Sequence, residues 1–151
     1  MTDWNTIEGI ELNVKIARLL GYHVIRNVGG ESTRYLLVSL NPNLYLQVSL
    51  TQHDDEESAW ADAPNFSGDL ALAKWLRGFV SDHGSYTGYN FVTGTTPDRN
   101  AICAFRPPSP YGLQREYSAE APGESDDSLT LASCRLVGML LEAGIINALP
   151  R

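Results

Sequence analysis

The sequence predicts an α+β fold, a layered sandwich in which three helices pack on a mainly antiparallel sheet of about five to six strands. Two segments, Ser67–Ser81 and Asp127–Ala143, have the apolar spacing and the end signals of amphipathic helices. About 45 residues that carry only strand and turn signals separate them. The length of 151 residues is typical of one domain that buries a sizeable core, so residues 1–151 are expected to form a single domain.

The first helix is predicted over Glu8–Leu20, where leucine and isoleucine recur with helical spacing. Its apolar stripe comprises Leu12, Ile16, Leu19 and Leu20. Gly21 follows where a helix commonly ends. Thr6 is the expected N-cap, because a hydroxyl before a helix accepts a hydrogen bond from a free backbone N–H group.

Strands are expected next, because segments rich in β-branched and aromatic residues alternate with turn residues. These segments are Tyr22–Arg26, Thr33–Leu40 and Leu44–Leu50, with breaks at Gly29–Gly30 and Asn41–Asn43. Together they predict an antiparallel meander.

Residues 51–65 are predicted to form an acidic loop. It contains His53, Asp54, Asp55, Glu56 and Glu57. Neighbouring like charges usually face water, which favours a solvated loop over a metal site. Trp60 lies in the same loop, where its indole must fold back as a lid or stay exposed.

The second helix is predicted to begin at Ser67 as its N-cap, with Asp69 in the first turn where the helix dipole favours a negative charge. Its apolar stripe comprises Leu72, Trp75, Leu76, Phe79 and Val80. His83–Gly84 suits the end of the helix, which makes His83 a helix-end residue, with a general base as the alternative.

Three more strands are predicted before the last helix. They are Tyr86–Thr93, Ala101–Arg106 and Leu113–Ala119. A turn at Gly94–Asn100 joins the first two, and a stiff proline-rich loop at 107–112 follows. The last helix has an apolar stripe that comprises Leu129, Ala132, Leu136, Met139 and Leu140.

Composition excludes several classes of function. Eleven Lys and Arg against eighteen Asp and Glu give a net charge of −7, and the basic residues are scattered, so general nucleic-acid binding is disfavoured. No apolar run is long enough to cross a membrane and no signal peptide is recognisable, which predicts a cytoplasmic protein. Cys103 and Cys134 lie in apolar settings and are expected to be buried free thiols, with a disulfide or a reactive thiol as the alternative.

The sequence carries no specific catalytic motif, metal motif or cofactor fingerprint. The three histidines, His23, His53 and His83, have no spacing that suggests shared metal coordination. Cys134 with His83 is the one conceivable pair of nucleophile and base, but the apolar neighbours of the thiol indicate burial. We therefore assign no catalytic residue, metal ligand or cofactor, and enzymatic activity is not favoured.

Four short stretches resemble a known family. They are Phe66–Trp75, Ala101–Phe105, Ala119–Pro122 and Leu131–Val137, and they are similar to the phage ABA sandwich domain. The resemblance implies a small layered α/β fold in a phage or prophage protein that acts in the cytoplasm of the host cell. The family offers no agreed catalytic residues that could be carried over to this chain.

The first functional hypothesis is a binder of a small nucleotide-type ligand, for instance a phage factor that sequesters a nucleotide-derived signal of host defence. Three Trp and seven Tyr against four Phe favour rings with a polar handle, which suit stacking combined with hydrogen bonding. The candidate ligand-binding residues are Trp60, Ser67, Gly68, Arg99, Arg106 and Arg115. The arginines and the backbone N–H groups at Ser67–Gly68 would hold an anion, unless the arginines are simply solvated.

The alternative hypothesis is a protein-interaction module that binds a host or phage protein. Its basis is the net charge of −7, the carboxylates at Asp54–Glu57 and strand edges that must be covered. Homo-oligomerisation is compatible with both hypotheses, because pairing of sheet edges or of the first helix would hide apolar surface.

Overall fold

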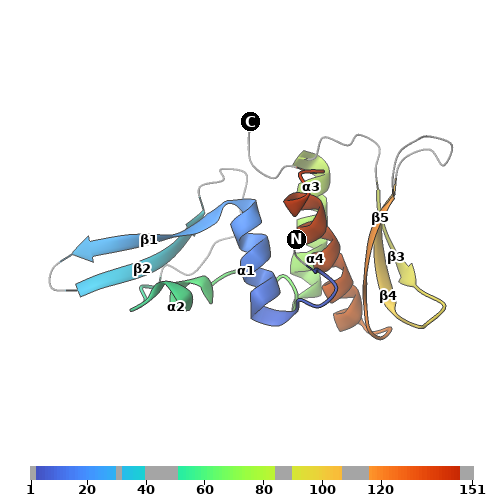
Figure 1. Cartoon of the computed structure of the whole chain (residues 1–151), viewed down its shortest axis with the longest axis horizontal. Coiled ribbons are helices and arrows are strands. Elements are labelled where there is room, and N and C mark those ends of the chain that lie inside the picture. Colours follow the sequence, from blue (N-terminus) through green and yellow to red (C-terminus); the bar gives the residue numbers. More distant parts are fainter. Residues whose placement is uncertain (1–2, 30–31, 40–50, 84–89, 107–115, 147–151) are drawn as a thin grey trace.

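The computed structural model describes residues 3–29, 32–39, 51–83, 90–106 and 116–146. Within these ranges the chain forms four helices and two antiparallel sheets, one of two strands and one of three. The α+β class and the antiparallel pairing are confirmed, but the single sheet of five to six strands and the count of three helices are wrong. Figure 1 shows the reason, because helices stand between the two sheets and keep them apart.

Helix α1 spans Gly9–Leu20 and ends at Gly21, whose φ of 102° requires glycine. The predicted cap is wrong: the N-cap is Glu8, whose side chain makes no capping hydrogen bond, while the Thr6 hydroxyl donates to the carbonyl of Asp3. The inner face of the helix is buried against the core through Leu12, Ile16, Ala17 and Leu20.

Strands β1 (Tyr22–Gly29) and β2 (Ser32–Ser39) form the two-stranded sheet, with Tyr22 opposite Ser39. This hairpin extends from α1 at one end of the molecule, and helix α2 covers one of its faces (Figure 1). The predicted strand Leu44–Leu50 lies outside the described residues.

Helix α2 spans Glu56–Trp60, so the prediction of an unstructured acidic loop at 51–65 is wrong in part. Asp55 caps the helix by accepting a hydrogen bond of 2.7 Å from the backbone N–H of Ser58. Glu56 and Glu57 occupy the first turn, where a negative charge stabilises the helix dipole. The four carboxylates at Asp54–Glu57 are exposed, as expected, whereas Asp62 is half-buried beside the His53 ring.

Helix α3 spans Leu70–His83, and its cap differs from the prediction. Asp69, not Ser67, takes that role, because its carboxylate accepts from the backbone N–H groups of Ala71 at 2.9 Å and Leu72 at 3.3 Å. An ionised carboxylate also suits the positive pole of the helix. The predicted end at His83 is confirmed.

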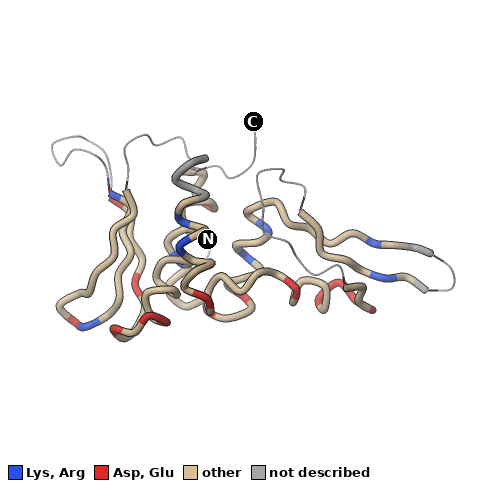
Figure 2. The backbone as a smooth tube through the Cα atoms, turned by 180° about the vertical axis from the view of Figure 1, so that it is seen from behind, with Lys and Arg blue, Asp and Glu red and all other residues tan. Residues whose placement is uncertain are grey.

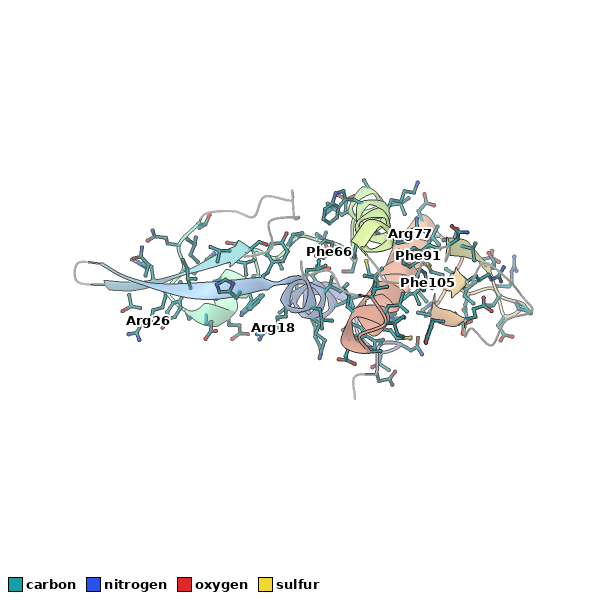
Figure 3. The ribbon with its side chains drawn as sticks, turned by 90° about the horizontal axis from the view of Figure 1, so that it is seen from above. Arg18, Arg26, Phe66, Arg77, Phe91 and Phe105 are labelled. Carbon is teal, nitrogen blue, oxygen red and sulfur yellow. The ribbon has the colours of Figure 1, made fainter. Side chains whose placement is uncertain are left out.

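The second sheet has the order β3-β4-β5, with β3 at Asn90–Thr95, β4 at Ala101–Arg106 and β5 at Tyr117–Ala121. The bounds predicted for β4 are confirmed, whereas β5 begins later than predicted, and part of the first predicted strand and all of the proline-rich loop at 107–112 lie outside the described residues. Phe91 and Phe105 stack with ring centroids 4.8 Å apart. Figure 3 shows both rings on the side of the sheet toward α3 and α4.

Helix α4 spans Asp126–Glu142 and is the centre of the core, since it contacts α1, α3, β4 and β5. Ser125 caps it by accepting from the backbone N–H of Ser128. Trp4 lies against Gly138 of this helix and donates a hydrogen bond of 3.1 Å from Nε1 to Glu142. In the described part of the chain, no helix is long and apolar enough to cross a membrane.

Candidate functional site

A groove of about 870 Å³ runs between α1 and α2. The residues that line it are Ile10, Glu11, Val14, Lys15, Arg18, Glu56, Glu57, Trp60 and Ala61. Its volume lies within the range of ligand-binding clefts. Helical spacing explains the lining, because positions 10, 14 and 18 of α1 and positions 56 and 60 of α2 recur every four residues and so share one face of each helix.

Two groups distinguish this groove, an exposed apolar side chain and a buried N–H group without a hydrogen-bond partner among the described residues. Ile10 is 66% exposed, the highest value for a large apolar side chain among the described residues. Trp60 is only 7% exposed, yet its Nε1 has no hydrogen-bond partner in the described part of the chain. A buried N–H group without a partner is costly, and such groups are rare in folded proteins.

Arg18 covers the indole of Trp60, with its guanidinium carbon 4.3 Å from the ring centroid. This distance is that of a cation–π contact. Viewed from above, Arg18 lies on the hairpin side of α1, beside α2 (Figure 3). Of the two alternatives left open for Trp60, folding back or staying exposed, the structure shows that it folds back, and the residue that it meets is on α1.

The segment that carries α2 is fastened to the hairpin. The backbone of His53 exchanges two hydrogen bonds with Tyr35 of β2, at 2.8 and 2.9 Å. The His53 ring is 2.7 Å from the carboxylate of Asp62, which closes the segment around α2, and Asp54 forms an ion pair with Arg34. These contacts hold Trp60 in place and give the groove a preformed wall.

A second hollow, of about 340 Å³, lies on the other side of the first turn of α1. Its lining residues are Glu8, Gly9, Asn65, Ser67, Gly68, Asp127 and Leu131. Both charged groups in this lining are carboxylates. The hollow therefore favours a cation and disfavours the anion that the sequence predicted at Ser67–Gly68.

The groove and the hollow open on an edge that we call the acidic edge. It comprises Glu8, Glu11, Glu56, Glu57, Asp126 and Asp127, all exposed. Figure 2 shows Asp and Glu gathered along this edge, over α2 and the first turns of α1 and α4. Figure 1 gives a structural reason, since α1, α3 and α4 all begin there and their positive poles attract carboxylates.

The backbone N–H groups predicted to bind an anion already have partners. The N–H of Ser67 donates to Oδ1 of Asn13 at 2.9 Å, and that of Gly68 donates to the carbonyl of Asn65 at 3.3 Å. A Cβ atom at Gly68 would lie 2.8 Å from Oδ1 of Asn65, so this glycine makes room for a neighbouring side chain. Both residues hold in place the turn that leads from α2 into α3, and Ser67 fastens this turn to α1.

The two predicted arginines that the structure describes are not brought together with Trp60 or Ser67. Arg99 pairs with Glu124 at 3.3 Å and Arg106 pairs with Glu116 at 2.6 Å, on the three-stranded sheet. Arg115 lies outside the described residues. The turn at residues 94–100 borders a separate hollow of about 160 Å³, also lined by Glu124 and Asp126.

The two thiols are free and buried, as predicted. Burial raises the pKa of Cys134 to about 12 and also raises that of Cys103. Sγ of Cys134 donates to the carbonyl of Phe66 at 3.0 Å. A protonated and enclosed thiol is a poor nucleophile, so the pairing of Cys134 with His83 gains no support.

Sequence reasoning missed Ile10, Glu11 and Val14 as candidate site residues. A signal was present, because Ile10 and Val14 are four residues apart and lie off the stripe of Leu12 and Ile16. A second apolar row on a helix predicts a second contact.

Comparisons with protein-family models, curated proteins and solved structures give no match. The resemblance to the phage ABA sandwich domain therefore stays a prediction.

Proposed function

We propose that this chain is a protein-interaction module that binds a basic segment of a partner protein along the acidic edge. The observation that carries the proposal is the groove between α1 and α2, where an exposed isoleucine and a buried tryptophan are bordered by three carboxylates, which outnumber the two cations of the lining, Lys15 and Arg18. Apolar area supplies affinity, and a complementary charge steers the encounter and selects the partner. The resemblance to phage proteins extends the proposal to a host or phage protein as the partner, met in the host cytoplasm.

The described structure identifies which carboxylates can be changed without unfolding the site. Asp54 pairs with Arg34 and Asp55 caps α2, so their replacement would disturb the groove wall itself. Glu56 and Glu57 make no hydrogen bond or ion pair with another described residue. They are the residues to neutralise.

The test compares two double variants of the whole chain. Glu56→Gln with Glu57→Gln removes two charges from the groove, and Asp98→Asn with Glu120→Gln removes two exposed charges outside it. Each protein is immobilised and a bacterial lysate is passed over it at low and at moderate salt. We expect salt-sensitive capture of a basic protein that the first variant loses and the second retains. Equal capture by both variants would refute a role for the groove.

A small planar ligand is a second candidate, supported by the stack of Arg18 on Trp60. The pair offers a ring face and a cation, the two groups predicted for a nucleotide-type ligand. A thermal-shift screen with cyclic nucleotides and ADP-ribose derivatives tests it, since a ligand at 100 times its Kd adds about 2.7 kcal/mol to the free energy of unfolding. Absence of any shift at millimolar concentration would exclude this candidate.

A further inference from the structure

We propose that the partner segment is bipartite, with a large apolar side chain in the groove and a Lys or Arg side chain in the hollow between Glu8 and Asp127. This inference rests on the proposed function, and it specifies the chemistry that the partner carries.

The two cavities are separate and lie on either side of the first turn of α1. Glu8 and Gly9 line the hollow, and the next two residues, Ile10 and Glu11, line the groove. The turn is thus a ridge between them, and Ile10 stands exposed on it. A segment that crosses this ridge fills both cavities and covers the isoleucine, whose exposure is unfavourable in water.

The groove selects the apolar part of the segment. Val14, Trp60 and Ala61 offer it an apolar surface between the helices. The orphaned Nε1 of Trp60 is enclosed in the free protein, so a backbone carbonyl of the segment can accept its hydrogen bond only when docking also shifts the indole. Arg18 covers the ring in the free protein, so its side chain swings aside when the segment docks.

The hollow selects the basic part. Its two carboxylates, on Glu8 and Asp127, make no hydrogen bond or close ion pair with another described side chain, although the charge of Arg135 acts on Glu8 from a distance. Asn65 and Ser67 add polar groups beside them. A guanidinium or ammonium group placed between two carboxylates gains charge-assisted hydrogen bonds. No lysine or arginine of the described residues lines this hollow. Arg135, whose charge acts on Glu8, is buried and donates to the carbonyls of Ile7 and Glu120, so a cation between the two carboxylates would come from the partner.

The spacing of the two parts follows from α1. Gly9 and Val14 are five residues apart, which at 1.5 Å per residue corresponds to roughly 8 Å along the helix axis. An extended segment advances about 3.3 Å per residue. The apolar and basic residues of the partner are therefore expected two or three positions apart.

The experiment selects binders of the purified whole chain from a surface-displayed library of random 12-residue peptides, near physiological salt. We expect enrichment of peptides with a large apolar residue and a Lys or Arg two or three positions away. The strongest peptide is then synthesised, and its Kd is measured for variants of the chain.

Two matched pairs of variants test the two contacts. Ile10→Ser should weaken binding by about tenfold or more, because it removes a buried apolar contact, whereas Ile25→Ser, at the other exposed isoleucine, should leave the Kd within about twofold. Asp127→Asn should weaken binding, but Asp98→Asn, which removes an exposed charge from the turn between β3 and β4 and outside the acidic edge, should not. Replacing the basic residue of the peptide by Gln should have little further effect on Asp127→Asn.

Fluorotryptophan NMR gives a structural readout, since the Trp60 signal, assigned with Trp60→Phe, should move on binding more than those of Trp4 and Trp75. Selection of basic peptides without the apolar residue, or equal effects within either pair, would overturn the bipartite site and leave the proposed function intact. Failure to enrich basic peptides would overturn both. A dimer that Ile10→Ser dissociates would identify a second copy as the occupant and overturn the inference.

Discussion

Replacing Gly138 by alanine tests the packing of the N-terminal segment on α4. A Cβ atom at this position would lie 2.6 Å from Cη2 and 2.8 Å from Cε3 of Trp4, well inside van der Waals contact. The indole is buried and held by its hydrogen bond to Glu142, so it cannot simply rotate away. Forcing extra volume into such a site costs about 1–3 kcal/mol.

The same substitution also brings a gain, because alanine is favoured over glycine inside a helix by about 1 kcal/mol. Gly78 in α3 provides the matched control, since a Cβ atom there would meet nothing within 4 Å. We expect Gly78→Ala to raise the free energy of unfolding and Gly138→Ala to lie about 1–3 kcal/mol below it. For a chain of this size the gap corresponds to roughly 2–12 °C in Tm.

Urea denaturation and thermal melts followed by circular dichroism measure both variants. In a Trp4→Ala background the ring is gone, so Gly138→Ala should recover the stabilisation seen for Gly78→Ala. If Gly138→Ala stabilises the protein with Trp4 in place, the indole does not sit on this glycine and the reasoning fails.

Three further predictions concern the turns and the thiols. In urea titrations, Asp69→Ala should lower the free energy of unfolding by about 1 kcal/mol through loss of the α3 cap, and Ser67→Ala should lower it by less. A larger effect of Ser67→Ala would identify Ser67 as the cap. Asn13→Ala should cost about 1–3 kcal/mol in the same assay, since it leaves the Ser67 N–H and the Asn65 side chain without their buried partner. Because burial raises the pKa of Cys134, the protonated thiol contributes its full stability below about pH 9, and this contribution is lost as the pH rises toward 12. Cys134→Ala should therefore flatten the fall in Tm over that pH range. An unchanged profile of Tm against pH would count against burial of the thiol.

The elements that were predicted well are those that local signals determine. Strand β4 runs from Ala101 to Arg106 as predicted, because a turn precedes it and a proline follows it. Helix α4 differs from its prediction by one residue at each end, since Ser125 and the acidic first turn mark its start. Such boundaries depend on neighbours in sequence, which the chain displays directly.

The division into two sheets could not be predicted in this way. Strand signals state that a segment is extended but not which strand it pairs with. The packing of α1 on α4 separates the two sheets, and those helices are more than a hundred residues apart in sequence. Helix α2 was missed for a different reason, since five residues are too few to show a helical period.

The predicted ligand site was wrong where it assumed that N–H groups and arginines were free to bind an anion. Ser67 and Gly68 look like donors awaiting an anion, but the turn uses both N–H groups itself, as buried backbone must. Arg99 and Arg106 likewise have carboxylate partners that are distant in sequence. Among the described ligand-binding candidates, Trp60 alone lines the groove, beside Glu56 and Glu57 of the predicted acidic contact. The residues that face it come from α1, about 50 positions earlier.

The carboxylates near the starts of the helices serve two purposes, and the structure allows these to be separated. Asp55 and Asp69 accept hydrogen bonds from backbone N–H groups, so they stabilise helix starts and are occupied. Glu56, Glu57 and Asp127 also lie in first turns, but they make no such bonds with other described residues and keep their acceptor capacity. Neutralising a residue of the first group should therefore lower Tm through the lost cap, whereas neutralising one of the second loses only the weaker interaction with the helix dipole and should lower Tm less while it changes partner affinity. A carboxylate of the second group whose loss lowers Tm as much as loss of a cap would show that the same group holds the helix end and binds the partner.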